Sequence, residues 1–160
     1  VSNSLTEVNL RDNSLGDEGW CALFDALRDK PQNKITTWDL SGQSISPAIC
    51  KSLAAYMAVS TSLTSCDVRQ NKIVGESALQ LSSVVVGNIN IVVFNEIPIK
   101  EMRTDSFEEL DLNGKGFGVE GSMVVAGLLP VMTSLTSLGL GYNSLRDEGV
   151  ASICDAIKSN

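Results

Sequence analysis

The chain has 160 residues, 43% of them hydrophobic, and a formal net charge of -7 at pH 7. This length suffices for one elongated domain and leaves no room for a catalytic domain beside it. The acidic charge repels phosphate groups, and no apolar run approaches the roughly 18 residues of a membrane-spanning helix. We therefore expect neither a nucleic-acid partner nor direct membrane insertion.

The chain has four cysteines and no histidine. The cysteines show no paired metal-ligand spacing, so we expect no metal site. Cys66 falls at an inward strand position, and Cys154 falls on the apolar face of the last predicted helix. Reduced core thiols explain this placement better than a disulfide framework does, which indicates an intracellular protein, cytoplasmic or within an organelle.

Six copies of one short pattern follow each other along the chain. Each copy has apolar residues at its positions 1, 4, 6 and 11, and several have asparagine at position 9. The copies begin near residues 5, 35, 63, 89, 107 and 135. The spacing predicts a short strand with alternate residues facing inward, then a tight turn in which the asparagine amide bonds the backbone. Such a unit cannot bury its own apolar face, so the copies must stack.

The first three repeats each predict a strand, a turn, a helix and a return loop. In the first repeat, apolar residues at helical spacing from Trp20 to Leu27 predict the helix, and Pro31 follows its end. The same apolar positions return in the second and third repeats at offsets of 30 and 58 residues. We therefore expect the helices on one side of a parallel sheet.

The fourth repeat breaks the pattern. Ile97 stands at its asparagine position, Pro98 follows, and only residues 100–106 separate Ile99 from the next strand. This segment is too short for a full helix and its return loop. We expect an irregular or single-turn connection and a local change in curvature.

The fifth and sixth repeats are regular again, and the sixth ends in a helix that includes Ile153. Neither end of the array carries an obvious polar capping unit. Repeat arrays usually need one, because terminal strands otherwise leave unpaired edges and a half-covered core. The expectation is a fragment of a longer array, or a chain held against neighbours at its ends.

The last copy, Leu135-Thr-Ser-Leu-Gly-Leu-Gly-Tyr-Asn-Ser-Leu145, shows the pattern in full. With the five other copies in phase, the chain resembles leucine-rich repeat proteins of the ribonuclease-inhibitor type and is similar to the repeat domains of NOD-like receptors. The resemblance covers essentially the whole chain and implies one α/β domain over residues 1–160. That domain is expected to be a right-handed solenoid, a horseshoe arc of six repeats with a short, irregular fourth. The parallel sheet should line its concave side, and helices should cover its convex side.

Two motifs suggest other chemistry. Gly116-Phe-Gly118-Val-Glu-Gly121 matches a dinucleotide-binding turn, but its glycines occupy the turn of a repeat, and no acidic residue lies about twenty residues beyond. Residues 111–122 resemble the opening of a calcium loop, but Ser122 stands where a bidentate glutamate is required. We therefore interpret both motifs as repeat turns and expect no cofactor.

Without histidine the commonest general base is absent, and no serine or cysteine has a partner suggested by spacing, so we expect no enzyme. The carboxylates that do form a pattern are Asp39, Asp67 and Asp111, at the strand position between the two inward residues. A column of these side chains on the concave face could receive a basic ligand. It could equally be a solvated strand face, which is the simpler interpretation.

Apolar residues interrupt this polar face in the fourth repeat. With that repeat beginning at residue 89, Ile91 and Val93 fall at outward positions that the other repeats fill mainly with polar residues. Exposed apolar side chains with a charged rim have the layout of a binding anchor. Alternatively, the irregular segment 97–106 covers them, or β-branched residues merely suit a strand. The predicted partner-binding residues are Ile91, Val93, Glu7, Arg11, Asp39, Asp67, Arg69, Glu109, Asp111 and Tyr142.

These features predict a non-catalytic protein-binding or scaffold module, acting through its concave face or its uncapped ends. The resemblance implies the same, since the family works chiefly by holding other proteins. Two alternatives stay open. One is a regulatory domain acting on an enzyme such as a small GTPase, and the other is a structural subunit of a large multi-subunit complex.

Overall fold

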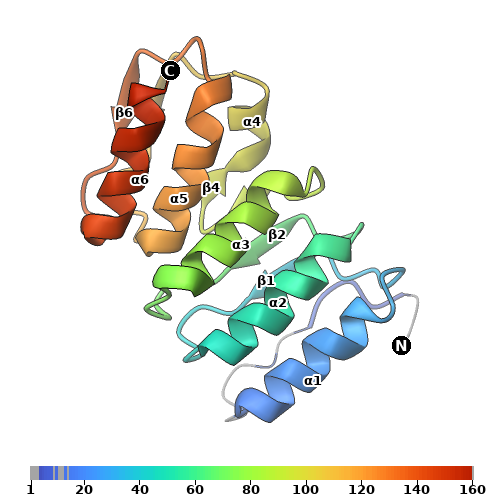
Figure 1. Ribbon diagram of the computed structural model, residues 1–160. Coiled ribbons are helices and arrows are strands. Elements are labelled where there is room, and N and C mark those ends of the chain that lie inside the picture. The colour runs from blue at the N-terminus through green and yellow to red at the C-terminus, as the bar shows by residue number, and fades with distance from the viewer. Residues whose placement is uncertain (1–3, 9, 11–12, 14, 160) are drawn as a thin grey trace.

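The computed structural model describes residues 4–8, 10, 13 and 15–159. Its long helices lie side by side in one layer, with the strands in a second layer behind them (Figure 1). In order along this row, the helices are α1 (Asp17–Arg28), α2 (Pro47–Val59), α3 (Gly75–Gly87), α5 (Gly118–Leu128) and α6 (Arg146–Lys158). The predicted placement of helices on one side of a parallel sheet is confirmed.

The strands of the described residues form two sheets. In the first, β1 (Thr37–Asp39), β2 (Ser65–Asp67) and β3 (Val93–Phe94) run parallel, and β4 (Ile97–Pro98) pairs antiparallel with β3. In the second, β5 (Glu109–Asp111) pairs parallel with β6 (Ser137–Gly139). An isolated parallel bridge joins Glu7 to Thr37. The mixed α/β fold with parallel pairing therefore matches the sequence pattern, but the sheet is interrupted after β4.

The core lies between the strand layer and the helix layer. In β1, β2 and β5 the central residue is buried, namely Trp38, Cys66 and Leu110, and Phe94 of β3, which pairs with Cys66, is buried in the same way. The neighbours of each central residue point away from the helices because side chains alternate along a strand. Alternation read from the sequence thus identifies the core residues of these repeats.

Asparagine holds the turn that follows the strand in two regular repeats. Asn71 Oδ1 accepts a hydrogen bond from the Ile45 amide at 3.1 Å, and its Nδ2 donates to the Leu40 carbonyl at 2.8 Å. Asn143 Oδ1 accepts in the same way from the Gly116 amide at 2.8 Å. Both side chains are buried and satisfy backbone groups of the preceding repeat, so the predicted role of asparagine is confirmed.

The fourth repeat begins two residues later than the sequence pattern indicated. Cys66 pairs with Phe94, which aligns the repeat start Leu63 with Ile91 rather than with Ile89. Ile91 is 0% exposed, whereas Ile89 is 83% exposed. Both isoleucines suit an inward strand position, so the sequence alone left the register ambiguous. The loop before β3 is held in this register by the Asn88 side chain, whose Nδ2 donates to the Met57 carbonyl at 2.6 Å.

The connection after β3 is short and irregular, as predicted. The chain turns at Asn95 into β4 and then into a five-residue helix, α4 (Ile99–Arg103). Asn95, rather than the residue at the expected asparagine position, bridges the flanking repeats. Its Oδ1 accepts from the Val68 amide at 2.8 Å, and its Nδ2 donates to the Phe117 carbonyl at 3.3 Å.

Arg103 in α4 caps the C-terminal end of α3. Its guanidinium donates to the carbonyls of Ile91 at 2.7 Å, Val85 at 2.6 Å and Asn88 at 2.9 Å. Val85 lies in the last turn of α3, where carbonyls lack partners within the helix, so Arg103 satisfies a backbone acceptor there. Partial burial lowers the pKa of Arg103. The short helix thus fixes the end of α3 although it does not join the row of long helices.

Helices α3 and α5 pack directly against each other because no long helix separates them. A Cβ at Gly127 would lie 2.9 Å from Val86 Cγ2, closer than side-chain contacts allow. Glycine is therefore needed where these two helices approach. The helix row is continuous across the fourth repeat, while the sheet beside it is not.

Candidate protein-interaction surface

We use the term strand face for the strand side chains that point away from the helix layer. Its members are Thr37, Asp39, Ser65, Asp67, Val93, Glu109, Asp111, Ser137 and Gly139. Most are exposed or half-buried, and no long helix of the structure covers them. This face is the surface on which the sequence placed a protein-binding site.

The predicted pair of apolar anchors is wrong in one member. Ile91 is fully buried in the core, because the fourth repeat begins there and Ile91 takes the inward position that Leu63 holds one repeat earlier. Val93 does belong to the strand face, where it pairs with Ser65 and is half-buried. The apolar feature of this face is therefore one side chain rather than two.

The acidic residues form two groups rather than one column. Asp39 and Asp67 are direct neighbours in the first sheet, whereas Asp111 lies in the second sheet opposite Gly139. Each carboxylate accepts a hydrogen bond from the backbone amide two residues further on, donated by Ser41, Arg69 and Asn113 at 3.1, 3.0 and 2.9 Å. Aspartate at this position thus helps to form the turn, in addition to placing charge on the strand face.

Arg69 joins two acidic residues of the first sheet and reaches across the sheet interruption to Lys115. Its Nη2 lies 2.7 Å from Asp67 Oδ2, and its Nη1 lies 2.7 Å from Glu96 Oε1. Nη1 also donates to the Lys115 carbonyl at 3.0 Å, while Lys115 Nζ lies 3.3 Å from Glu96 Oε2. The hydrogen bonds that Arg69 donates to Asp67 raise the pKa of Arg69, and the one that it donates to Glu96 lowers the pKa of Glu96.

This network changes how two predicted contact residues are interpreted. Asp67 and Arg69 pair with each other, so less of their charge is available to a partner than the sequence suggested. Glu96 and Lys115 are not among the contact residues predicted from the sequence. No local pattern marks them, because the contact between Arg69 and Lys115 joins residues 46 positions apart.

The other predicted residues are spread along the molecule. Glu7 is exposed beside β1, Glu109 is exposed on β5, and Tyr142 is 94% exposed in the turn after β6. Arg11 lies outside the described residues. The structure therefore brings together Asp39, Asp67, Arg69 and Val93 in neighbouring repeats but does not gather the ten residues into one cluster.

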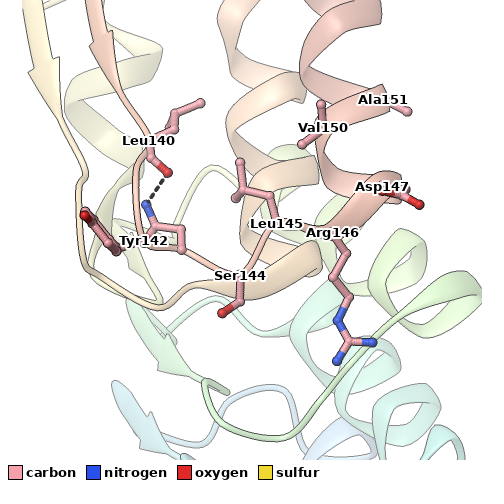
Figure 2. Close-up of a pocket in the computed structure, with 9 residues that line it drawn as sticks. Leu140, Tyr142, Ser144, Leu145, Arg146, Asp147, Val150 and Ala151 are labelled. Carbon is pink, nitrogen blue, oxygen red and sulfur yellow. Dashed lines mark hydrogen bonds between the residues drawn. The ribbon is translucent and has the colours of Figure 1, made fainter.

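A second surface lies between β6 and α6 and includes Tyr142, one of the predicted contact residues. A pocket of ≈ 680 Å³ is lined there by Leu140, Leu145 and Val150, with Tyr142 and Asp147 at its sides (Figure 2). Leu140 and Leu145 are only half-buried, whereas the matching residues of the third repeat, Val68 and Ile73, are buried. Val68 and Ile73 are buried because a further repeat stacks against the third repeat, whereas no described repeat stacks on this side of the sixth.

The cysteines are free thiols. Cys66 is buried, as predicted, and burial raises its pKa. Cys154 is exposed, contrary to the prediction, because α6 turns the adjacent Ile153 toward the core and one residue is about 100° of helix rotation. Across the parts of the chain that the structure describes, no group of side chains could hold a metal ion, and no helix is long and apolar enough to cross a membrane.

Comparison with known proteins agrees with the repeat geometry. Residues 1–23 and 131–154 match the family described as Leucine Rich repeat. The chain is a leucine-rich repeat protein of the ribonuclease-inhibitor type. It is 30% identical over 161 residues to human NACHT, LRR and PYD domains-containing protein 2, and 27% identical over 156 residues to the pig ribonuclease inhibitor. It is also 25% identical over 171 residues to the mouse ribonuclease inhibitor.

These alignments cover 98–99% of this leucine-rich repeat chain but only part of each relative. The chain spans 13% of the human protein, 31% of the pig inhibitor and 37% of the mouse inhibitor. Leucine-rich repeat domains generally mediate protein–protein interaction and are typically non-catalytic. The strand face and the surface beside β6 are therefore the surfaces of this repeat protein to consider for binding.

Proposed function

We propose that this leucine-rich repeat protein is a non-catalytic binding module whose strand face holds a basic protein partner. In this proposal, residues 1–160 form one domain, a right-handed arc of six repeats with the strand face on its concave side. The observation that supports it is the set of exposed carboxylates on that face. Asp39, Glu109 and Asp111 are all exposed and lie on strands of both sheets.

The carboxylates are held in place before any partner arrives. The Asp39 and Asp111 side chains accept backbone hydrogen bonds, so binding need not freeze them from a fully mobile state. The net charge of -7 adds a long-range attraction to a basic partner, which raises the association rate. Val93, half-buried between the acidic groups, supplies an apolar contact.

An intracellular location is part of the same proposal. All four cysteines lie in the described part of the chain as free thiols, and two of them are buried in the core. A reducing compartment keeps such thiols unpaired.

The strand face can be tested with variants that remove charge but preserve the turns. We would combine Asp39→Asn, Glu109→Gln and Asp111→Asn, since an asparagine oxygen can still accept the amide hydrogen bonds that Asp39 and Asp111 accept. The matched control removes the same number of carboxylates from the helix side, by Glu18→Gln, Glu76→Gln and Asp155→Asn, all exposed. Partners captured from an extract of the source would be quantified by mass spectrometry for each protein.

The proposal predicts a partner that is retained by the helix-side control and lost by the strand-face variant. Thermal unfolding of both variants should match that of the unmodified protein, which would show that the loss comes from the surface. Retention of every partner by a correctly folded strand-face variant would contradict the proposal.

A second candidate is a structural subunit of a larger assembly, docked through the surface beside β6. The half-buried Leu140 and Leu145 and the fully exposed Tyr142 favour it. Under this candidate, Val150→Asp together with Tyr142→Ser would release the partners, while the strand-face variant would keep them. The two candidates therefore predict opposite results from the same pair of proteins.

A further inference from the structure

A pocket of ≈ 300 Å³ lies where the turns of the third, fifth and sixth repeats meet. Its walls come from the turn after β2, the turn between β5 and α5, and the start of α6. The lining residues are Gln70, Lys72, Ile73, Val74, Gly116, Gly118, Val119, Glu120, Ser144 and Arg146. It is separate from the strand face, and it borders the surface beside β6, with which it shares Ser144 and Arg146.

The pocket is a consequence of the irregular fourth repeat. That repeat turns back at Asn95 and provides no long turn leading into a full helix. The turns of the third and fifth repeats therefore come close enough for the Asn95 side chain to hydrogen-bond to both repeats. The first turns of α3 and α6 are nevertheless tied together, because the Gly75 amide donates to Glu148 Oε2 at 2.9 Å. Helix α5 begins between them and forms part of the pocket wall.

Two cations line this pocket. Lys72 and Arg146 are exposed, and neither forms an ion pair with another residue of the described ranges. Figure 2 shows the Arg146 side chain directed away from α6, toward the part of the molecule that contains the turn after β2. An unpaired guanidinium and an unpaired ammonium on one pocket are arranged to attract a shared anion.

The acidic residue of the pocket is Glu120, which is only 3% exposed. Its Oε1 accepts a hydrogen bond from Asn95 Nδ2 at 3.2 Å. Burial raises the pKa of Glu120 to about 7, and the negative charge of Asp67 acts in the same direction. The ionisable or charged groups of the surrounding elements are Cys50 on α2, Asp67 on β2, Arg69 and Lys72 in the turn after β2, Glu96 between β3 and β4, Lys115 before α5, and Arg146 and Glu148 on α6.

The protonation state of Glu120 decides what the pocket attracts. With Glu120 protonated, the pocket carries two positive charges, and the carboxyl group offers a hydrogen-bond donor. With Glu120 ionised, the carboxylate opposes an anion. A cationic ligand would be repelled by Lys72 and Arg146 in either state. A dinucleotide does not fit the site, because the pocket has no acidic residue placed for a ribose and is small.

We propose that this pocket binds an oxyanion, a phosphate or sulfate group, between Lys72 and Arg146, and that Glu120 takes up a proton from solvent as the anion enters. The bound anion and the protonated carboxyl stabilise each other. Binding therefore strengthens as the pH falls through the range in which Glu120 titrates. The protonated carboxyl group of Glu120 donates a hydrogen bond to the anion, whereas the ionised carboxylate would repel it.

Sulfate is the probe to use first, because its charge does not change between pH 6 and pH 8. Chemical-shift titrations of the full chain at constant ionic strength should show saturable shifts at residues around the pocket. If only the protonated form of Glu120 binds, the affinity should fall about tenfold from pH 6 to pH 8. No saturable shift at the pocket at pH 6 would overturn the proposal.

Two variants separate the contributions of the cations and the acid. Lys72→Gln with Arg146→Gln should abolish sulfate binding, whereas the matched control Lys51→Gln with Lys100→Gln, exposed lysines outside the pocket, should leave it unchanged. Glu120→Gln keeps a neutral side chain whose oxygen can accept from Asn95, so it should bind sulfate equally at pH 6 and pH 8. A persistent tenfold pH dependence in that variant, or equal loss in the control, would overturn the proposal.

Comparison of inorganic phosphate with glycerol phosphate at pH 6 then identifies the source of the anion. Tighter binding of the ester would identify an organic phosphate as the ligand, and equal binding would identify the free ion. Failure to saturate with either phosphate would contradict the site. None of these measurements involves a protein partner, so their outcome is independent of the strand-face proposal.

Discussion

The third and fourth repeats solve the same structural problem with different residues. In the third, β2 leads into a turn held by Asn71 and then into the 13-residue helix α3. In the fourth, β3 leads into a hairpin at Asn95 and then into the five-residue helix α4. The backbone groups still find partners, because Asn95 and Arg103 reach across to the neighbouring repeats. The comparison shows that a repeat array can lose a helix if side chains replace its hydrogen bonds.

The largest loss of stability is expected from a charge at the first inward residue of the fourth repeat. Ile91→Asp places a carboxylate in the core and should reduce the free energy of unfolding by at least about 4 kcal/mol. The matched change Ile89→Asp, two residues earlier on an 83% exposed side chain, should alter it by less than about 0.5 kcal/mol. Urea denaturation monitored by circular dichroism measures both. A larger loss for Ile89→Asp than for Ile91→Asp would show that the fourth repeat begins at residue 89.

The junction that the short repeat creates should also make stability depend on pH. Burial raises the pKa of Glu120 from its ordinary value to about 7, so between roughly pH 4.5 and pH 7 the folded protein binds more protons than the unfolded chain. Stability from this group is present below that range and is lost as the pH rises through it. A change on the order of 3 kcal/mol is expected.

Glu120→Gln removes this titration. The difference in unfolding free energy between the variant and the unmodified protein should grow in favour of the variant from pH 5 to pH 8. Using the difference cancels the titration of Glu96 and Asp105, whose lowered pKa values act in the opposite direction at lower pH. A difference that stays constant with pH would show that Glu120 is ionised throughout.

Removal of the Arg103 side chain, which caps the end of α3, should cause a smaller loss of stability. Arg103→Ala removes the side-chain donor from the carbonyls of Val85 at the end of α3 and of Asn88 and Ile91 after it, and should cost about 2–3 kcal/mol of unfolding free energy. Arg28→Ala removes an arginine from α1 that pairs with Asp25 and Asp29 near the surface, and should cost below about 1 kcal/mol. Thermal or urea unfolding of the two variants measures both losses of unfolding free energy. Similar small losses would mean that water replaces the guanidinium of Arg103.

Much of the fold followed from the spacing of apolar residues. Inward positions such as Trp38 and Cys66, the turn asparagines Asn71 and Asn143 and the short connection after β3 all agree with the pattern. The register of the fourth repeat did not follow, because Ile89 and Ile91 satisfy the same local rule. Only the packing against α3 and the Asn88 turn separates them.

Only those residues of the candidate site that a local pattern assigns could be predicted from the sequence. Alternation along a strand assigns Asp39, Glu109 and Asp111 to the strand face, and the structure places them there. It cannot show that Arg69 bridges Asp67 and Glu96, or that Lys72, Glu120 and Arg146 line one pocket. These groups come from turns of different repeats, and their approach depends on how far the fourth repeat shortens the path between its neighbours.

The repeating unit follows from the amino-acid sequence, because a strand period of two, a helical period and a turn asparagine are local and act over a few residues. How the repeats meet depends on the packing of the folded chain. It set the interruption of the sheet, the direct packing of α3 on α5 and the burial of Glu120. The physical reason is that these features arise from contacts between residues tens of positions apart, whose distances depend on the summed geometry of every element between them.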